Sequence, residues 1–295
     1  MVNGEMTLSA PVLEPIRDQD IAEVCAFIRE HHATTMGLLP CQRAFCHDWD
    51  PDKPNNGYLL RDGERLVGVL GAIYSRRLIR GREERLLNLT SWVVLEPYRA
   101  HSLKLMQALL KQPGFHVTSL SPSAHVVRLY ERLKFQFLDN ASVGIPHLFL
   151  PRLKGGGLCT EEVDLLKEGL PAEVVRILHD HDNMPSMVGT RRLIVGTPQR
   201  SALVFFRIAP HFLQPLLAAT LLYVSDAEIL LANLDLVKRH LLWRYRALHT
   251  RVALRHLGGR RPWLAWDFLD VNRQQYLSQT LHAADFDNLY SEWVA

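Results

Sequence analysis

The sequence predicts a mixed α/β (α+β) chain in which mostly antiparallel sheets are flanked by helices, arranged as two tandem domains. Three observations indicate this class. Residues 88–110 carry the pattern of a strand, a tight turn and a helix. Strand patterns joined by a hairpin signal precede this unit, and the second half of the chain repeats part of the order. At 295 residues, the chain is long enough for two domains with a core each.

The chain is organised around the segment from Asn88 to Leu110. Its first part is apolar and β-branched, and Pro97 ends strand pairing because proline has no N–H to donate. Ser102 is the predicted N-cap of the helix that follows. Helical spacing then relates three apolar residues: Leu103, Met106 and Leu110. The N-terminus of a helix can hold a phosphate, and Arg99 strengthens its field. An ordinary βα turn with a solvated Arg99 gives the same pattern.

The elements before this unit follow from local signals. Residues 15–18 end a first strand, and residues 21–28 have the spacing of an amphipathic helix. Repeated prolines interrupt residues 33–56, which we predict to be a loop, or short helices with loops, forming one wall of an acceptor site. Asp62 and Gly63 give a hairpin signal between two of three antiparallel strands: 57–60, 65–74 and 85–95.

After the central unit, we expect a strand at 115–120 and a helix at 123–133. The apolar face of that helix is Val126, Leu129, Tyr130 and Leu133. Two closing strands are then predicted at 135–138 and 143–150. Three consecutive glycines mark residues 151–160 as a linker. The predicted domains are therefore residues 1–150 and residues 161–295.

The second half reads as an altered copy of the first. It contains a helical segment and four strands, with a long helix at 227–249 and a helical C-terminal tail. The strands are predicted at 192–196, 202–208, 216–224 and 251–257. Val224 corresponds to Val94 at the end of a central strand. Asp226 then stands where a phosphate-holding turn is expected, so we predict a helix cap there and no phosphate binding.

Composition excludes several classes of function. The formal net charge of +3 gives no case for nucleic acid, and no apolar run is long enough for a transmembrane helix. The segment from Lys238 to Arg261 is basic and lacks acids; an exposed helix face or an anion site both fit it. Four unevenly spaced cysteines and the lack of a signal sequence predict a cytoplasmic protein with reduced thiols. Cys41, Cys46 and His47 match no common zinc spacing, and the cluster at 179–182 reads as helix-end polar residues, so no metal is predicted.

Residues 12–150 resemble the GNAT superfamily of acyl-CoA-dependent N-acyltransferases. Three stretches carry the likeness: residues 15–24 (PIRDQDIAEV), 93–102 (VVLEPYRAHS) and 123–135 (SAHVVRLYERLKF). The second stretch is similar to the acyl-CoA motif, in which a strand leads into a phosphate-holding turn. The resemblance implies a GNAT fold in the first half and a degenerate GNAT-like copy in the second.

The resemblance also implies roles for individual residues. Main-chain groups of Val93, Val94 and Leu95 pair with the pantetheine arm of acetyl-CoA or another acyl-CoA. Tyr130 is the general acid that protonates the departing thiolate, although its place on an apolar stripe also fits a core residue. Backbone groups hold the pyrophosphate at Arg99, Ala100, His101, Ser102 and Leu103. His101 is equally well placed to lie in solvent.

The sequence departs from the family pattern where small residues are usual. Ser102 and Lys104 occupy the glycine positions of the turn, where Lys104 supplies charge instead, and Lys134 replaces the glycine before Phe135. The general base is open among several carboxylates or water: Glu83, Glu84, Glu96 and Asp139. We predict transfer of an acyl group to an amine of a small molecule or sugar precursor. The alternatives are a non-catalytic acyl-CoA-binding or scaffold protein and a protein-amine acetyltransferase.

Overall fold

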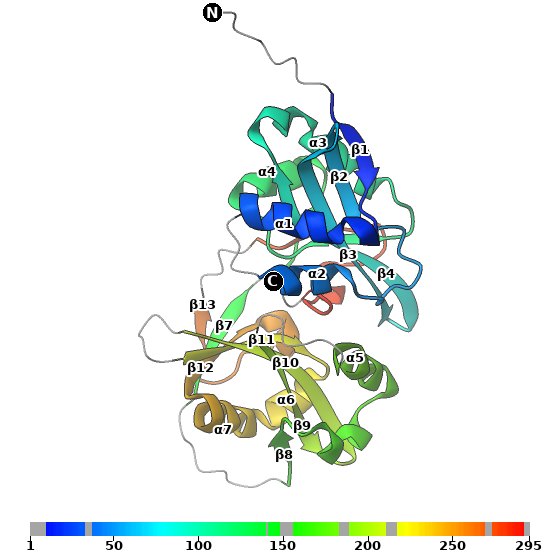
Figure 1. The fold of residues 1–295 in the computed structure, drawn as a ribbon. Helices are drawn as coiled ribbons and strands as arrows, with labels where there is room; N and C mark the ends of the chain where they lie inside the picture. Colours follow the sequence, from blue (N-terminus) through cyan, green and yellow to red (C-terminus); the bar gives the residue numbers. More distant parts are fainter. Residues whose placement is uncertain are drawn as a thin grey trace, which may run out of the picture. The chain divides into compact units, whose positions relative to one another are not determined.

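The computed structural model describes residues 10–32, 37–139, 141–147, 156–182, 189–210, 217–268 and 273–291. It divides the chain into two compact units, and the strands form two sheets. The first unit contains Met1–Ser121, Arg132–Phe135 and Gln275–Leu281. The second contains Pro122–Glu131, Gln136–Gln274 and His282–Ala295. Mixed, mostly antiparallel sheets with flanking helices confirm the predicted fold class (Figure 1).

The first sheet has the strand order β1-β2-β3-β4-β5-β14-β6. Its strands are β1 Val12–Pro15, β2 Gly57–Asp62, β3 Arg65–Ile79, β4 Arg82–Val94, β5 His116–Ser119, β14 Gln275–Leu277 and β6 Gln136–Phe137. The three antiparallel strands predicted before the central turn are confirmed as β2, β3 and β4. Gly63, in the predicted hairpin turn, has a φ of +58°, which glycine adopts without steric cost.

Helices cover both faces of the first sheet (Figure 1). α1 (Ile21–His31) and α2 (Leu38–Phe45) pack on the face that carries Val69 and Val93. α3 (Ser102–Leu110) lies on the opposite face, where the hydroxyl of Tyr74 contacts the side-chain oxygen of Gln112 at 2.8 Å. α2 comes so close that a methyl group at Gly71 would lie 2.8 Å from the Phe45 ring.

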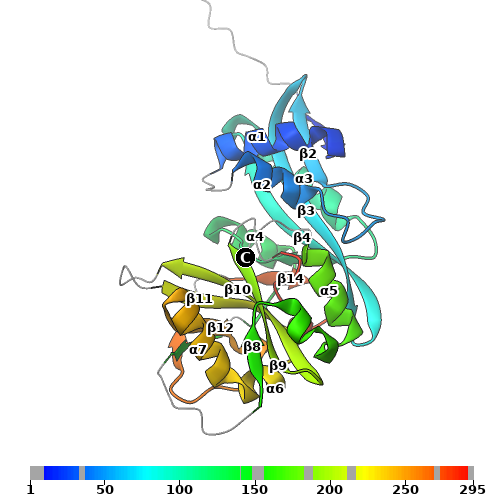
Figure 2. The same cartoon turned by 60° about the horizontal axis from the view of Figure 1, so that its bottom comes forward.

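The second sheet repeats this design with the order β8-β9-β10-β11-β12-β7-β13. Its strands are β8 Leu158–Thr160, β9 Thr190–Thr197, β10 Arg200–Pro210, β11 Leu217–Val224, β12 Ala247–Ala253, β7 Ser142–Pro146 and β13 Trp266–Phe268. α6 (Ala227–Ala232) and α7 (Leu234–Tyr245) lie along this sheet in Figure 2 and share its core. The unit also contains α5 (Ala172–Asp182) and α4 (Ala124–Arg132).

The two central strands match in detail. β4 pairs with β5 in parallel, and β11 pairs with β12 in parallel, whereas the neighbouring pairs β3–β4 and β10–β11 are antiparallel. Each central strand also carries one extra residue relative to its antiparallel neighbour, shortly before Val94 in β4 and before Val224 in β11. This shared bulge supports the predicted correspondence of Val94 with Val224 and the tandem arrangement.

One short strand lies in the opposite sheet from the one expected, and another was not expected at all. Residues 143–150 were predicted to close the first sheet, but β7 pairs with β12 and β13 of the second. In exchange, β14 comes from the C-terminal part of the chain and pairs with β5 of the first sheet. The polar and apolar pattern of a short strand indicates its faces and does not choose its partner.

Other expectations differ at element boundaries. Leu158–Thr160, inside the predicted linker, forms β8 against β9, and residues 148–155 lie outside the described residues. The helix predicted at 227–249 is broken at Asn233 and ends at Tyr245. The tail predicted to be helical instead contains β13 and β14. The domain limits at 150 and 161 remain predictions.

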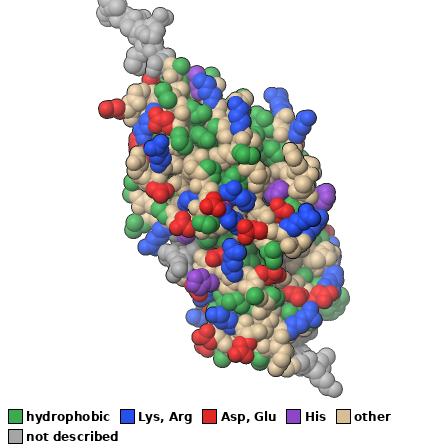
Figure 3. Space-filling view, turned by 90° about the vertical axis from the view of Figure 1, so that its right-hand side faces the viewer, with side chains coloured by type: hydrophobic (Ala, Val, Ile, Leu, Met, Phe, Trp, Pro, Cys, Tyr) green, Lys and Arg blue, Asp and Glu red, His purple; other side chains and the backbone are tan. Residues whose placement is uncertain are grey.

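No helix in the described part of the chain is long and apolar enough to cross a membrane. On the face drawn in Figure 3, acidic and basic side chains are interspersed. Several basic residues between Lys238 and Arg261 have acidic partners, including Asp235 for Lys238, Glu228 for Arg260 and Asp267 for Arg261. These pairs support the interpretation of this segment as a balanced surface.

Candidate functional site

The turn after β4 is a short 3₁₀ helix of six residues, held by one buried side chain. It spans Glu96–His101 and runs directly into α3. Tyr98 is 4% exposed, and its hydroxyl donates a hydrogen bond to Oδ2 of Asp62 at 2.5 Å. This bond to a carboxylate raises the pKa of Tyr98. The turn is therefore fixed to the β2–β3 hairpin.

Ser102 does not cap α3 as predicted. The N-cap is His101, which makes no capping hydrogen bond with its side chain, and the N–H of Ser102 donates to the carbonyl of Arg99. Because the 3₁₀ turn continues into the helix, there is no extended residue from which a side chain can fold back onto the first turn. The buried stripe is also shifted from the predicted one and consists of Leu105, Met106 and Leu109.

The side chains of the turn point mostly to solvent. Arg99 forms an ion pair with Glu96 at 2.8 Å, and the two side chains are 69% and 73% exposed. Ala100, Leu103 and Lys104 are exposed, and His101 and Ser102 are half-buried. An exposed ion pair is worth about 1 kcal/mol or less, so Arg99 is free to exchange Glu96 for a phosphate.

The main chain of Val94 faces the outer edge of β4. In antiparallel pairs, opposite residues alternate between those that exchange hydrogen bonds and those that do not. The N–H of Leu95 donates to the carbonyl of Val67 at 2.9 Å, and Val94 lies opposite Gly68. Leu95 and Val93 therefore use their main chain on β3. Of the three residues expected to pair with a pantetheine arm, only Val94 has main-chain groups that face away from β3.

The edge that Val94 faces is not covered by β5. The register of β4 with β5 runs from Leu86↔His116 to Asn88↔Thr118, and β5 ends at Ser119. β4 continues to Val94. The pairing of the two parallel strands therefore ends at Asn88, and β5 does not cover the edge of β4 beyond it.

Polar side chains occupy the same face of β4 and β5 at and before this point. The hydroxyl of Thr118 donates to Oδ1 of Asn88 at 3.1 Å. Glu84 lies 3.0 Å from Nε2 of His116, whose Nδ1 lies 2.9 Å from the hydroxyl of Ser278. The Ser278 oxygen also accepts hydrogen bonds from the N–H groups of two later residues, so its own proton is directed to His116. The Nε2–H group of His116 therefore donates its hydrogen bond to the carboxylate of Glu84.

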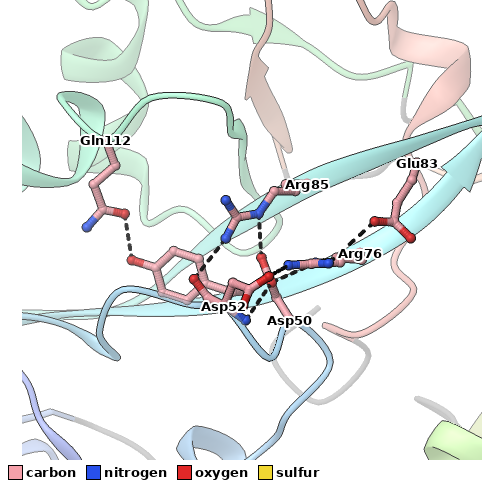
Figure 4. Close-up of polar contacts among 7 residues, drawn as sticks. Asp50, Asp52, Arg76, Glu83, Arg85 and Gln112 are labelled. Carbon is pink, nitrogen blue, oxygen red and sulfur yellow. Dashed lines mark hydrogen bonds and ion pairs between the residues drawn. The ribbon is translucent and has the colours of Figure 1, made fainter.

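A buried ionic cluster holds the 46–56 segment against β3 and β4 (Figure 4). Asp50 is fully buried and lies 2.8 Å from Nε of Arg76 and 2.7 Å from Nε of Arg85. Burial raises the pKa of Asp50, but the hydrogen bonds from Arg85 and Arg76 outweigh it and hold the pKa below its usual range. Asp52 also pairs with Arg76. The segment predicted to form an acceptor wall is therefore tied to the sheet that carries Asn88.

Tyr130, the predicted general acid, lies on α4 and is 3% exposed. α4 belongs to the second unit, whereas the turn and β4 belong to the first. The other buried residue of this helix is Val127, which was not predicted, whereas Val126, Leu129 and Leu133 are half-buried. The catalytic role of Tyr130 stays a prediction.

The four carboxylates considered as general base have different surroundings. Glu83 and Glu96 are about half or more exposed and pair with Arg76 and Arg99. Asp139 is in an exposed loop, where it accepts a hydrogen bond from the N–H of Ala141. Glu84 is 23% exposed and pairs with His116. Among the four, Glu84 alone is coupled to a histidine.

In the second unit, the equivalent turn is closed by a carboxylate. Oδ1 of Asp226 accepts hydrogen bonds from the N–H groups of Glu228 at 2.8 Å and Ile229 at 2.9 Å. Arg200 pairs with Asp226 at 3.3 Å. The predicted cap is confirmed. Because Asp226 takes these donors and adds negative charge, the turn is unsuited to a pyrophosphate.

In the described part of the chain, no group of three or more His, Cys, Asp or Glu residues is arranged to hold a metal ion. Cys25 and Cys41 are buried, and their thiols are hydrogen-bonded; this bond and burial raise the pKa of Cys25. In the 179–182 cluster, His181 contacts the carbonyl of Ile177 at 2.6 Å, and Asp180 accepts a hydrogen bond from Tyr290. These contacts fit helix-end polar residues.

No protein-family model and no curated protein matches the sequence. Solved structures match it clearly. A GCN5-related N-acetyltransferase from Anabaena variabilis has a TM-score of 0.61 at 10% identity, with 90% of this chain and 72% of that chain covered. The fold is that of the GCN5-related N-acetyltransferases.

Two further structures agree with the GNAT fold. A probable N-acyltransferase from Enterococcus faecalis has a TM-score of 0.57 at 12% identity, covering 90% of this chain and 71% of that chain. A putative acetyltransferase from Pyrococcus horikoshii covers 98% of this chain and 96% of its own, with a TM-score of 0.51 at 11% identity. The match therefore extends over both GNAT-like units, and at these identities it establishes the fold alone.

Two polar side chains of the site were not predicted from the sequence. Asn88 was included in the central segment without a role, and His116 was read only as part of a strand. Period-two alternation places Glu84 and Asn88 on one face of β4, and this signal was available. Their partners on β5 and β14 depend on strand pairing.

Proposed function

We propose that this protein transfers an acyl group from acyl-CoA, most simply acetyl-CoA, to an amine of a small molecule by direct attack on the thioester. One observation carries the proposal. The main chain of Val94 faces an edge of β4 that β5 does not cover, and the same strand leads into the turn that contains Arg99. An extended arm that ends in a pyrophosphate fits this combination of strand edge and turn.

Each part of the site has a role in this reaction. The N–H and carbonyl of Val94 pair with the amides of the pantetheine arm. Arg99 exchanges Glu96 for the pyrophosphate, which the main chain of the turn also contacts. Glu84 and His116 form a pair that can accept the proton that the amine nitrogen loses, and Tyr130 returns a proton to the thiolate of CoA. Holding the thioester beside the amine supplies much of the acceleration.

A proline substitution tests the strand-edge contact. Val94→Pro removes the outward N–H without removing a donor to β3, and Val94→Ala shortens the side chain but keeps that N–H. Calorimetric titration with acetyl-CoA should give micromolar binding for the native chain and Val94→Ala. We expect binding at least about tenfold weaker for Val94→Pro, since one well-formed hydrogen bond is worth about 1.5 kcal/mol. Equal affinity of all three proteins would remove the strand edge from the proposed site.

A non-catalytic acyl-CoA-binding protein is the second candidate. It is favoured by the pairing of Arg99 with Glu96 and by the use of the Ser102 N–H within the turn, because both leave fewer groups ready for a phosphate. Release of free CoA thiol in the presence of a panel of amines separates the two. Turnover that is lost in Tyr130→Phe with binding retained supports the enzyme, and binding without turnover on any amine supports the second candidate.

A further inference from the structure

The side chain of Asn88 has a buried donor without a partner. Asn88 is 3% exposed, and its Oδ1 accepts the hydrogen bond from Thr118. Among the residues that the structure describes, its Nδ2 has no hydrogen-bond partner. A carboxamide nitrogen carries two N–H groups, and leaving them unsatisfied away from water costs free energy. Native proteins keep such groups rarely, so this one requires an explanation.

The position of Asn88 in the sheet explains why its donor is unpaired. Asn88↔Thr118 is the last paired position of β4 and β5, the point from which the two strands part. Val94, whose main chain faces the same edge, lies about 20 Å further along β4 at roughly 3.3 Å per residue. A ligand that enters at the turn and follows this edge ends at Asn88. The unpaired amide therefore lies where the reactive end of an acyl-CoA is expected.

The face of the sheet on which Asn88 lies is consistent with a contact to the acyl group. Asn88 lies opposite Ile73, one residue away from the pair Tyr74↔Leu87. Since neighbouring residues of a strand point to opposite faces, Asn88 faces away from α3 and toward the side of α1 and α2. Glu84 and His116 lie on the same face: His116 is about 7 Å before Thr118 along β5, and Glu84 is about 13 Å before Asn88 along β4. A proton acceptor and an unpaired N–H donor thus share one face.

We propose that the Nδ2 group of Asn88 donates a hydrogen bond to the carbonyl oxygen of the bound acyl thioester. This inference rests on the proposed function. When the amine nitrogen attacks, it forms a C–N bond, and the carbonyl π electrons move to oxygen. They return as the C–S bond breaks; the nitrogen then gives its extra proton to the pair of Glu84 and His116, and the leaving thiolate takes a proton from Tyr130. Asn88 gives up no proton; it stabilises the charge that develops on oxygen, as a fixed donor does in an oxyanion hole.

Thr118 orients this donor. Its hydroxyl proton is committed to Oδ1 of Asn88, which turns Nδ2 toward the unpaired side. The reverse orientation of the amide would direct an oxygen at the acyl carbonyl and repel it. Loss of the Thr118 hydroxyl should therefore weaken recognition of the carbonyl without touching the ligand.

The test compares three ligands by calorimetry on the full chain: acetyl-CoA, CoA and S-ethyl-CoA, a thioether that lacks the carbonyl oxygen. We expect acetyl-CoA to bind about fivefold or more tightly than S-ethyl-CoA. This ratio should fall to about one in Asn88→Leu and to an intermediate value in Thr118→Val. Affinity for CoA itself should stay unchanged and reports that each variant is folded.

The vibrational frequency of the acyl carbonyl provides a second test. The carbonyl stretch of acetyl-CoA labelled with ¹³C at the carbonyl carbon should move to lower wavenumber on binding the native chain, and less in Thr118→Val. Equal affinity for acetyl-CoA and S-ethyl-CoA, with an unshifted carbonyl, would overturn the role of Asn88 while leaving CoA binding intact. Binding of none of the three ligands would overturn the proposed function and this inference with it. If Asn88→Leu fails to fold, the affinities of the native chain and of Thr118→Val for acetyl-CoA and S-ethyl-CoA still test the proposal.

Discussion

The hydroxyl of Tyr98 donates a 2.5 Å hydrogen bond to the carboxylate of Asp62, which joins the turn after β4 to the hairpin between β2 and β3. The two residues are far apart in the sequence, yet the turn that precedes α3 has its only buried side chain here among the residues 96–101. The bond holds the turn against the β2–β3 hairpin. The proposed pyrophosphate contacts therefore depend on a residue that touches no ligand.

Removal of this hydroxyl should destabilise the first unit and loosen the turn. For Tyr98→Phe, we expect the free energy of unfolding to fall by about 1–3 kcal/mol, as for hydrogen bonds to charged groups, and acetyl-CoA to bind more weakly. Asp62→Asn keeps an acceptor oxygen at the same place and should lose less. Urea denaturation and calorimetry measure the two effects. A Tyr98→Phe protein as stable as the native chain would show that the bond contributes nothing net.

The ion pair of Arg99 with Glu96 predicts opposite effects for its two partners. Arg99→Ala should weaken acetyl-CoA binding, whereas Glu96→Gln should strengthen it up to about fivefold, because it frees Arg99 and removes a negative charge beside the pyrophosphate. Both effects should shrink at high salt, since the groups are exposed. Titrations at two ionic strengths measure this. Weaker binding by Glu96→Gln would contradict a phosphate at this turn.

The buried carboxylate of Asp50 predicts a large difference between two neighbouring aspartates. Asp50→Asn leaves Arg76 and Arg85 without their shared anion, and we expect a loss of about 3 kcal/mol in the free energy of unfolding. Asp52 is 73% exposed, so Asp52→Asn should change stability by less than about 1 kcal/mol. Urea denaturation measures both variants. Similar losses in the free energy of unfolding would mean that burial does not increase the contribution of Asp50 to stability.

A buried histidine predicts acid sensitivity in the second unit. Burial lowers the pKa of His147 from 6.5 to about 4, against an opposing hydrogen bond with the carbonyl of Ala247. The unfolded chain binds this proton more readily, so the contribution is complete above pH 6.5 and is lost as the pH falls toward 4. Between pH 7 and 5 the loss is about 2 kcal/mol.

Comparison of pH slopes isolates this residue. His147→Gln cannot bind the proton, so its stability should fall less steeply than that of the native chain between pH 7 and 5, whatever its absolute stability. Thermal denaturation at several pH values measures both slopes. Identical slopes would show that His147 titrates alike in the folded and unfolded states.

Lys134 predicts a stabilising substitution. This residue takes the place of a glycine in the GNAT-like motif and has a φ of +66°, in the left-handed region where a side chain is strained. Lys134→Gly should raise the free energy of unfolding by up to about 1 kcal/mol, and Lys134→Ala should not, because alanine keeps the strain. A rise in melting temperature for alanine alone would point to charge instead of backbone strain.

Local chemistry explains the parts of the fold that could be predicted. The Asp62-Gly63 turn, the three antiparallel strands and the Asp226 cap each depend on residues adjacent in the chain. The Ser102 cap was mispredicted because a 3₁₀ turn enters the helix directly, which also shifts the buried stripe of α3 to Leu105. Such a turn has no distinctive sequence pattern.

The class of fold, the strand–turn–helix unit that contains Arg99 and the carboxylate that closes the second turn could all be predicted from the sequence. The three-dimensional fold was needed to show which sheet receives β7 and β14, which main chain faces the uncovered edge of β4, and that Nδ2 of Asn88 has no hydrogen-bond partner among the described residues. The reason is physical. Turns and caps are set by neighbours a few residues away, whereas strand partners and unsatisfied groups are set by contacts between segments far apart in the chain.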